Sequence, residues 1–179
     1  MTQPVSSSLM PRDTRRREQV AVFSIAEFSF VISAASIQEI RSTDSLGGTV
    51  VDLDRPVMKK VRHIVERDGR AYYVVSGYEH FHMSQSRPTT VLILRSAPVA
   101  VLVDRIDEMA EMRVLLALPQ SFHGEERTWY RGLTVLERKV LPVANPLGFL
   151  TAGELQQLEE QNPGLLQTAA APWLQRGRG

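Results

Sequence analysis

The chain contains no cysteine, which excludes disulfide bonds, thiolate catalysis and cysteine-ligated zinc together. Its absence also fits a reducing compartment. Every apolar run is far shorter than the roughly 20 residues that a membrane-spanning helix requires. The arginine-containing N-terminus is followed by no apolar segment of the signal-peptide type. We therefore expect a cytoplasmic protein that inserts into no membrane.

A large excess of charge of one sign is also missing, since the net charge is +1 over 179 residues. Residues 1–19 and 162–179 each carry a charge of +2, which leaves −3 for the body between them by difference. A body of that sign repels phosphates, so the folded part is not expected to bind nucleic acid. The basic ends, including Arg15–Arg17, are interpreted as solubilising segments.

Sequence signatures of catalysis are absent as well. The chain has no Gly-x-Ser-x-Gly motif, no phosphate-binding loop and no dinucleotide fingerprint. Asp104, Asp107, Glu108 and Glu111 recur at spacings of three or four, which is typical of a solvated helix face or sheet edge. The sequence therefore predicts no cofactor and no enzymatic activity, and a folded domain of this kind acts through its surfaces.

His80 and His82 form the strongest candidate metal site, because two residues at positions i and i+2 share one face of a strand. A catalytic metal needs at least one more protein ligand, and the six residues that follow His82 contain no acid. The preferred interpretation is two polar positions beside a buried Phe81, with no metal bound. A small metal-dependent β-barrel enzyme that uses both histidines remains the alternative, and a self-associating structural scaffold is a third possibility.

The hydrophobic pattern divides the chain into a flexible arm at 1–19, a folded domain at 20–160 and a tail at 161–179. About nine short strands, rich in Val, Ile and Phe, are separated by turns every 8–12 residues, which favours β-barrels or a sandwich. Residues 67–70 are predicted to form a tight turn. Thr151 is expected to cap a helix that extends to Glu160.

Two segments are ambiguous in their pattern, and a third is plainly polar. Asp54–Pro56 resembles the start of a helix through residue 65, yet a strand over 61–65 fits equally well. Residues 104–112 have the position of a strand and the composition of a helix. Residues 119–128 are expected to form a polar loop.

Several motifs, taken in order, resemble the CheW-like family of chemotaxis coupling proteins. The first is Ile37-Gln38-Glu39-Ile40-Arg41 after two Phe-rich strands. Val103-Asp104-Arg105-Ile106-Asp107 resembles the Val-Asp-x-Val/Ile-Asp signature at the end of the family's central strands. The remaining matches are Leu116–Pro119, Trp129–Leu133 and Asn145–Leu147. Each motif is weak by itself, but their order and spacing extend over residues 20–158.

The resemblance implies a mostly β fold of two small SH3-like five-stranded β-barrels side by side, with a C-terminal helix. It implies a non-enzymatic adaptor that couples a CheA-type histidine kinase, through its regulatory domain, to the cytoplasmic tip of chemoreceptors. Carried over by position, the residues implied to contact partners are Ile37, Glu39, Ile40, Arg41, Arg67 and Gly69.

The segment from Ile64 to Val75 departs from the family pattern, which has Gly-Val-x-Asn-Leu-Arg-Gly before a Pro-Val-x-Asp-Leu strand. Here the Asn and Leu are missing, Asp68 stands between Arg67 and Gly69, and Tyr73 occupies the usual place of proline. Because that segment contributes to receptor contact in the family, a changed receptor interaction is expected. Glu39 and Arg41 alternate with Ile40 along an extended segment, so the two charges share one face and suit the polar rim of an interface.

Overall fold

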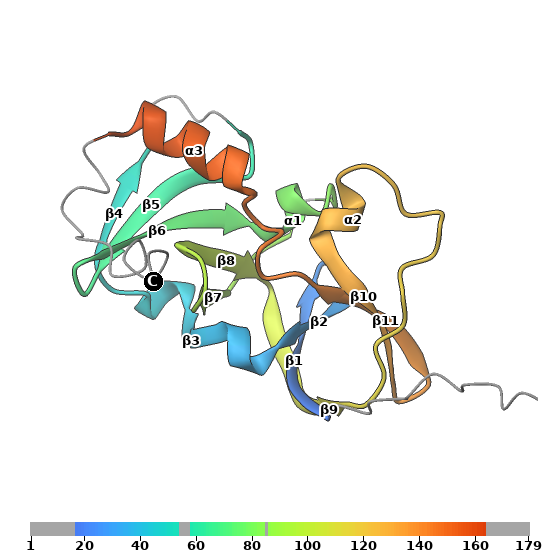
Figure 1. The fold of residues 1–179 in the computed structure, drawn as a ribbon. Helices are drawn as coiled ribbons and strands as arrows, with labels where there is room; N and C mark the ends of the chain where they lie inside the picture. The colour runs from blue at the N-terminus through green and yellow to red at the C-terminus, as the bar shows by residue number, and fades with distance from the viewer. Residues whose placement is uncertain (1–16, 54–57, 85, 164–179) are drawn as a thin grey trace, which may run out of the picture.

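The computed structural model describes residues 17–53, 58–84 and 86–163. Their eleven strands form two sheets (Figure 1). The first sheet has the order β10-β11-β2-β1-β9 and the second has the order β3-β7-β8-β6-β5-β4. The first sheet comprises β1 (Glu18–Ile25), β2 (Phe28–Ser33), β9 (Arg105–Met112), β10 (Tyr130–Leu136) and β11 (Lys139–Ala144). The second comprises β3 (Ile37–Ser42), β4 (Thr49–Asp52), β5 (Val61–Arg67), β6 (Arg70–Ser76), β7 (Thr90–Leu94) and β8 (Val99–Val103).

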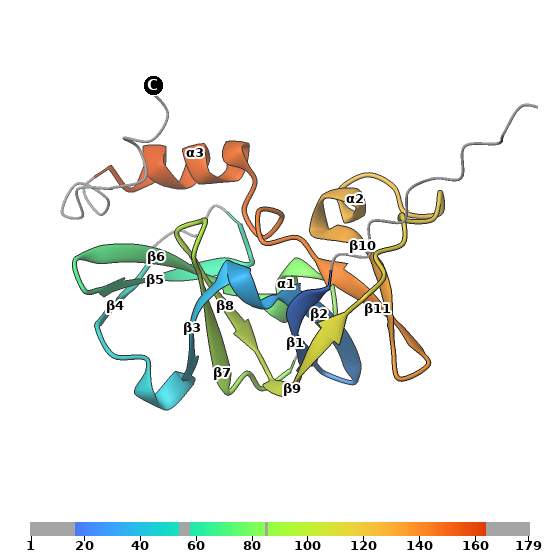
Figure 2. The same ribbon diagram turned by 60° about the horizontal axis from the view of Figure 1, so that its bottom comes forward.

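The second sheet is inserted into the first along the chain. After β2 the backbone crosses through a short 3-10 helix, η1 (Ala34–Ser36), into β3, and it returns from β8 to β9 through the single residue Asp104. Most neighbouring strands are antiparallel, but β2 and β11 pair in parallel, as do β6 and β8. The short connections hold the two sheets side by side, as both views show (Figures 1 and 2).

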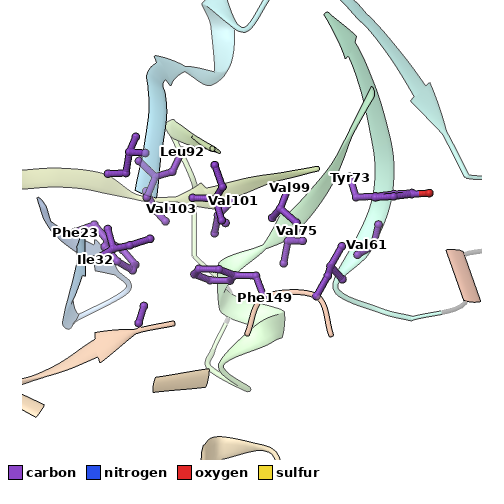
Figure 3. Close-up of a cluster of buried hydrophobic side chains, with 14 of the residues drawn as sticks. Phe23, Ile32, Val61, Tyr73, Val75, Leu92, Val99, Val101, Val103 and Phe149 are labelled. Carbon is purple, nitrogen blue, oxygen red and sulfur yellow. The ribbon is translucent and has the colours of Figure 1, made fainter. Parts of the chain in front are cut away.

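Strands β1 and β2 bury side chains on both faces, which explains their nearly continuous apolar sequence. Phe23 and Phe30 point into a core shared by the two sheets, and Val20 and Val31 point into a smaller core within the first sheet. The shared core also receives Val75 and Val101 from the second sheet. Figure 3 shows Phe149 lying between side chains of both sheets. A common apolar core therefore joins the two halves of the fold.

The first sheet curls back on itself beyond the end of β9. Leu116 pairs with Leu133 of β10 through two backbone hydrogen bonds of 2.7 and 2.9 Å. The hydroxyl of Thr134 donates to the carbonyl oxygen of Val114 at 2.6 Å. The chain after β9 thus borders β10 and brings the two ends of the sheet together.

The described ranges also contain three α-helices: α1 (Gly77–His80), α2 (Glu126–Trp129) and α3 (Ala152–Gln161). Helix α3 lies over the second sheet (Figures 1 and 2) and buries Leu158. Its first turn forms a capping box, in which the Thr151 hydroxyl accepts from the Glu154 amide and the Glu154 carboxylate accepts from the Thr151 amide. The Glu154 carboxylate also lies 2.8 Å from Nζ of Lys60. The predicted cap at Thr151 is confirmed.

The mostly β class, the two-part organisation and the closing helix are all confirmed. The second sheet has six strands rather than the five expected, and the total is eleven rather than about nine. Residues 61–65 belong to strand β5 because they pair with β6, and residues 105–112 form β9 because they pair with β1. The polar loop expected at 119–128 ends in the single turn of α2, which begins at Glu126.

Parts of the sequence-based division fall on residues that the structure does not describe. These are residues 1–16 of the predicted arm, the proposed helix start at 54–57 and residues 164–179 of the predicted tail. Strand β1 begins at Glu18, two residues before the expected start of the folded domain. Within the described ranges, no helix is long and apolar enough to cross a membrane.

Candidate protein-binding surface

Strand β3 carries four of the six residues that the sequence assigned to partner contact. It stands at one end of the second sheet, with β7 as its only hydrogen-bonded neighbour in the strand order. Ile37 is buried at the start of the strand, where a register shift lies between Ile37 and Glu39. Ile40 is 42% exposed, and Arg41 is also exposed. A terminal strand with an exposed apolar residue can accept another protein chain at its edge.

Glu39 and Arg41 share one face of β3, as the alternation predicted. The guanidinium of Arg41 forms a hydrogen-bonded ion pair with Oε1 of Glu39. Both side chains are partly exposed, and this pair by itself contributes little to stability. It fixes the direction of two charges on the surface of the strand, which favours specificity in binding.

Arg67 reaches the same carboxylate from β5, a strand far from β3 in the order of the sheet. Its Nη1 lies 2.8 Å from Oε2 of Glu39 as an ion pair without hydrogen-bond geometry, and its Nη2 donates to Oε1 at 3.2 Å. Curvature of the second sheet is what brings the end of β5 back to β3. The structure therefore assembles Glu39, Arg41 and Arg67 into one charged cluster.

Two opposing effects act on the Glu39 carboxyl group. Burial acts to raise its pKa, while hydrogen bonds and charge attraction from Arg41 and Arg67 act to lower it, and the net result is a lowered pKa. The side chain of Arg67 is only 17% exposed, so that its charge depends on Glu39 for compensation. The lowered pKa keeps the Glu39 carboxylate ionised at neutral pH.

Gly69 occupies the two-residue turn between β5 and β6. Asp68 and Gly69 both have positive φ, at 52° and 71°, and Arg67 pairs with Arg70 across the turn. Two positive φ angles are typical of a type I′ hairpin, which confirms the tight turn predicted at 67–70. Asp68 also lies 3.6 Å from Nε of Arg67. The inserted Asp68 thus belongs to the turn that positions Arg67.

Gly48 allows the loop before β4 to lie against the end of β5. A Cβ atom at Gly48 would lie 2.3 Å from the carbonyl oxygen of Glu66 and 3.3 Å from Cβ of Arg67. Only a residue without a side chain permits that approach, and the φ of +84° also favours glycine. The loop therefore supports the backbone from which Arg67 extends.

The two aspartates of the Val103–Asp107 motif form hydrogen bonds with the end of β1 and the β1–β2 turn, a role that the sequence did not reveal. The Asp104 carboxylate accepts from the backbone amide of Ala26 at 2.7 Å, and its own amide donates to the carbonyl of Ser24 at 2.9 Å. The Asp107 carboxylate accepts from the hydroxyl of Ser24 and from Nε of Arg105. Ala26 has a positive φ of 52°. These carboxylates hold the β1–β2 turn beside the crossover into β9.

His80 and His82 do not share a face of a strand, so the geometry expected for a metal site is wrong. His80 ends helix α1 and His82 follows it in a turn with a φ of 53°. His80 is 2% exposed, and its ring lies among those of Phe81, Trp129 and Phe149. Among the described residues, no three His, Asp or Glu side chains form a cluster suited to a metal ion.

Burial also determines the protonation state of His80. Loss of hydration, with smaller contributions from Lys60 and His82, lowers the pKa of its imidazole to about 3. Its Nδ1 has no hydrogen-bond partner. The ring is therefore neutral at physiological pH and serves as part of the shared core.

The architecture described above has the CheW-like fold: two β units, the second inserted into the first, with a helix closing over the second. The fold is similar to the scaffolding protein TtCheW from Thermoanaerobacter tengcongensis, with a TM-score of 0.64 and 12% sequence identity. The match covers 78% of this chain and 96% of that chain. No family model and no curated protein matches the sequence. The likeness thus lies in the fold, which is the fold that the sequence motifs predicted.

Proposed function

We propose that this chain is a divergent member of the CheW-like family that acts as a non-enzymatic adaptor in chemosensory two-component signalling. In this proposal it binds the regulatory domain of a CheA-type histidine kinase and couples that kinase to the cytoplasmic tip of chemoreceptors. The scaffold fold supports the general role. The working location is the cytoplasm, where both partners present these domains.

The observation that carries the proposal is the cluster of Glu39, Arg41 and Arg67 at the end of the second sheet. It joins the residues that the family resemblance assigned to binding, although 28 positions separate Glu39 from Arg67. Ile40 adds an exposed apolar side chain on the same strand. An apolar contact beside oriented charges is the composition of a specific protein interface.

Arg67 does not present a free guanidinium for contact with a receptor. Its charge is already engaged by Glu39 and its side chain is largely buried. We propose that Arg67 holds Glu39 in position for the kinase, and that receptor contact uses the exposed Asp68–Gly69 turn. The altered segment from Ile64 to Val75 would then change which receptor is recognised.

Titration calorimetry of the full chain with the kinase regulatory domain tests this proposal. We expect a dissociation constant on the order of micromolar, or about −8 kcal/mol. Glu39→Arg places three cations together and is expected to weaken binding at least about tenfold. Glu27→Arg introduces the same charge change at an exposed position of the β1–β2 turn and serves as the matched control.

A second variant separates loss of binding from loss of folding. Ile40→Lys changes an exposed side chain that belongs to no core cluster, so the fold is expected to persist. Equal affinity for the wild type, Glu39→Arg and Ile40→Lys would contradict the proposed surface. A second titration adds a receptor tip to the complex and compares the wild type with Asp68→Asn, because asparagine tolerates the positive φ of that exposed turn position. Receptor affinity is expected to fall while kinase affinity is unchanged.

A further inference from the structure

The outer face of the β10–β11 hairpin is apolar over both strands and the bordering 114–116 segment. Leu133 pairs with Pro142, and Val135 pairs with Val140. Leu116 borders Leu133 on the other side. Because pairing is antiparallel, Val114 falls beside Val135, consistent with the hydrogen bond from Thr134 to the Val114 carbonyl. We call this set the outer hairpin face; its members are Val114, Leu116, Leu133, Val135, Val140 and Pro142.

These side chains alternate with others that point into the first sheet. Thr134 is fully buried, and Leu136 and Leu141 pack against the inner core that contains Val143. Residues one position away on the same strands therefore point outward. An outward strand face of a protein that works alone is normally polar, yet every member of this one is apolar.

The outer hairpin face is also accessible. Val135 is 47% exposed and Val140 is 60% exposed, while Val114 and Leu116 are 46% and 44% exposed. The hairpin projects at the end of the molecule opposite α3, as both ribbon views show (Figures 1 and 2). Four exposed aliphatic side chains in adjacent positions form a patch, and such patches mark interaction sites.

The charges that border this patch indicate what covers it. Glu137 and Arg138 stand at the hairpin tip, and Arg131 forms a two-armed ion pair with Glu18 at the opposite end, at 2.9 and 3.2 Å. Exposed Lys139 follows at the tip, so the tip carries one acid and two bases, while the opposite end carries one of each. An anionic membrane or a nucleic acid requires a larger excess of cations than this single one.

A flank with this composition is self-complementary. A second copy can be rotated by 180° about an axis that lies in the plane of the outer hairpin face and runs perpendicular to its strands. Its hairpin tip then meets the Glu18–Arg131 end of the first copy. In this arrangement Glu137 of one copy lies near Arg131 of the other, and Glu18 lies near Arg138. The two apolar faces cover each other. Interfaces with twofold symmetry use the same patch on both partners in this way.

We infer that the outer hairpin face is a homodimer contact, in which two copies of this chain pack their β10–β11 hairpins face to face. This contact is separate from the β3 surface proposed for the kinase and does not depend on it. A standard interface draws roughly 20–30 residues from each side. The outer hairpin face is smaller than that, so the dimer forms in a concentration-dependent manner with a dissociation constant on the order of tens of micromolar.

Sedimentation velocity of the full chain from about 1 μM to about 1 mM, a range that brackets such a dissociation constant, measures this equilibrium directly. Val135→Glu buries a carboxylate in the dimer but is solvated in the monomer, and it is expected to raise the dissociation constant at least about tenfold. Val50→Glu, at a 56% exposed valine of β4 in the second sheet, is the matched control and leaves the equilibrium unchanged. Circular dichroism checks that both variants fold.

Cross-linking provides a second measurement, because the chain has no cysteine of its own. Val135→Cys lies near the centre of the outer hairpin face and is expected to form a disulfide-linked dimer on mild oxidation. Val50→Cys is expected to remain monomeric under the same conditions.

Three results would overturn the inference. One is a wild-type protein that stays monomeric up to about 1 mM, well above the expected dissociation constant. Another is a dimer that Val135→Glu leaves intact. The third is loss of kinase-domain binding in Val135→Glu with no change in self-association, which would assign the face to a different protein. Loss of kinase binding in Glu39→Arg alone bears only on the proposed function, so that the two proposals fail independently.

Discussion

Nη1 of Arg67 lies 2.8 Å from Oε2 of Glu39, although the two residues belong to strands β5 and β3, which are separated by three others in the sheet order. The two side chains can meet because the second sheet is curved. It also places a nearly buried guanidinium against a carboxylate that Arg41 holds from the other side. Four predictions test how this and other contacts stabilise the fold.

The Glu39–Arg67 ion pair is expected to contribute measurable coupling energy. Arg67 is 17% exposed, so the pair is expected to reach the upper end of the 0–1 kcal/mol range of surface pairs. A double-mutant cycle with Glu39→Gln and Arg67→Met, followed by urea denaturation, is expected to give about 1 kcal/mol. The same cycle on Glu18 and Arg131 provides a comparison pair at the surface of the first sheet. Coupling indistinguishable from zero for Glu39 and Arg67 would show that their contact is incidental.

The two glycines before β4 are expected to respond differently to alanine. Gly47→Ala meets no atom within 4 Å and incurs only the cost of a left-handed φ of +66°, about 1 kcal/mol. Gly48→Ala has a similar backbone cost and also drives Cβ to 2.3 Å from the Glu66 carbonyl oxygen. We expect its free energy of unfolding to fall by roughly 1–3 kcal/mol more than that of Gly47→Ala. Equal losses in thermal denaturation would contradict the close packing of this loop on β5.

Asp104 is expected to be more important for stability than an exposed acid. Its carboxylate accepts a hydrogen bond from the backbone amide of Ala26, a residue of the β1–β2 turn with positive φ. Asp104→Ala removes the acceptor and is expected to lower the free energy of unfolding by about 1–3 kcal/mol. Asp44→Ala, in the exposed 3-10 turn after β3, is the control. Chemical denaturation of both variants gives the comparison, and similar losses would refute the assigned role.

His80 is expected to make the protein sensitive to acid. The pKa of its imidazole is about 3 in the folded state and close to the ordinary 6.5 in the unfolded state, so the unfolded chain binds the extra proton between these values. Above pH 6.5 the imidazole is neutral in both states, so its titration does not lower the free energy of unfolding. As pH falls from 6.5 toward 3, the free energy of unfolding decreases by about 1.4 kcal/mol per pH unit.

His80→Phe keeps an aromatic ring in the same apolar surroundings and removes that titration. Between pH 7 and pH 4.5 it is expected to lose less stability than the wild type in urea denaturation. His123→Gln changes an exposed histidine and should reproduce the wild-type pH dependence. A His80→Phe variant with unchanged pH dependence would mean that His80 is not buried as a neutral ring.

Much of the fold followed from local sequence. The mostly β class came from Val-, Ile- and Phe-rich runs, the 67–70 turn from an Asp-Gly pair, and the helix start from Thr151 as the N-cap. These features depend on side-chain chemistry within a few residues. The sequence also placed Glu39 and Arg41 on one face, because strand alternation alone determines that.

Other features were decided only by contacts between distant segments. Residues 105–112 became a strand because β1 supplies their hydrogen bonds, despite a composition that favours a helix. The histidines were misplaced because helix α1 turns His80 into an aromatic core assembled from Phe81, Trp129 and Phe149. No local pattern encodes those neighbours.

The sequence by itself determined which residues carry charge and which strands they occupy, since alternation and turn chemistry are local properties. Tertiary structure decided that Arg67 meets Glu39, that Asp104 supports the turn at Ala26, and that the apolar residues of β10, β11 and the 114–116 segment form one outward face. Sheet curvature and strand pairing brought these groups together. Both arise from the packing of the whole chain around a shared core.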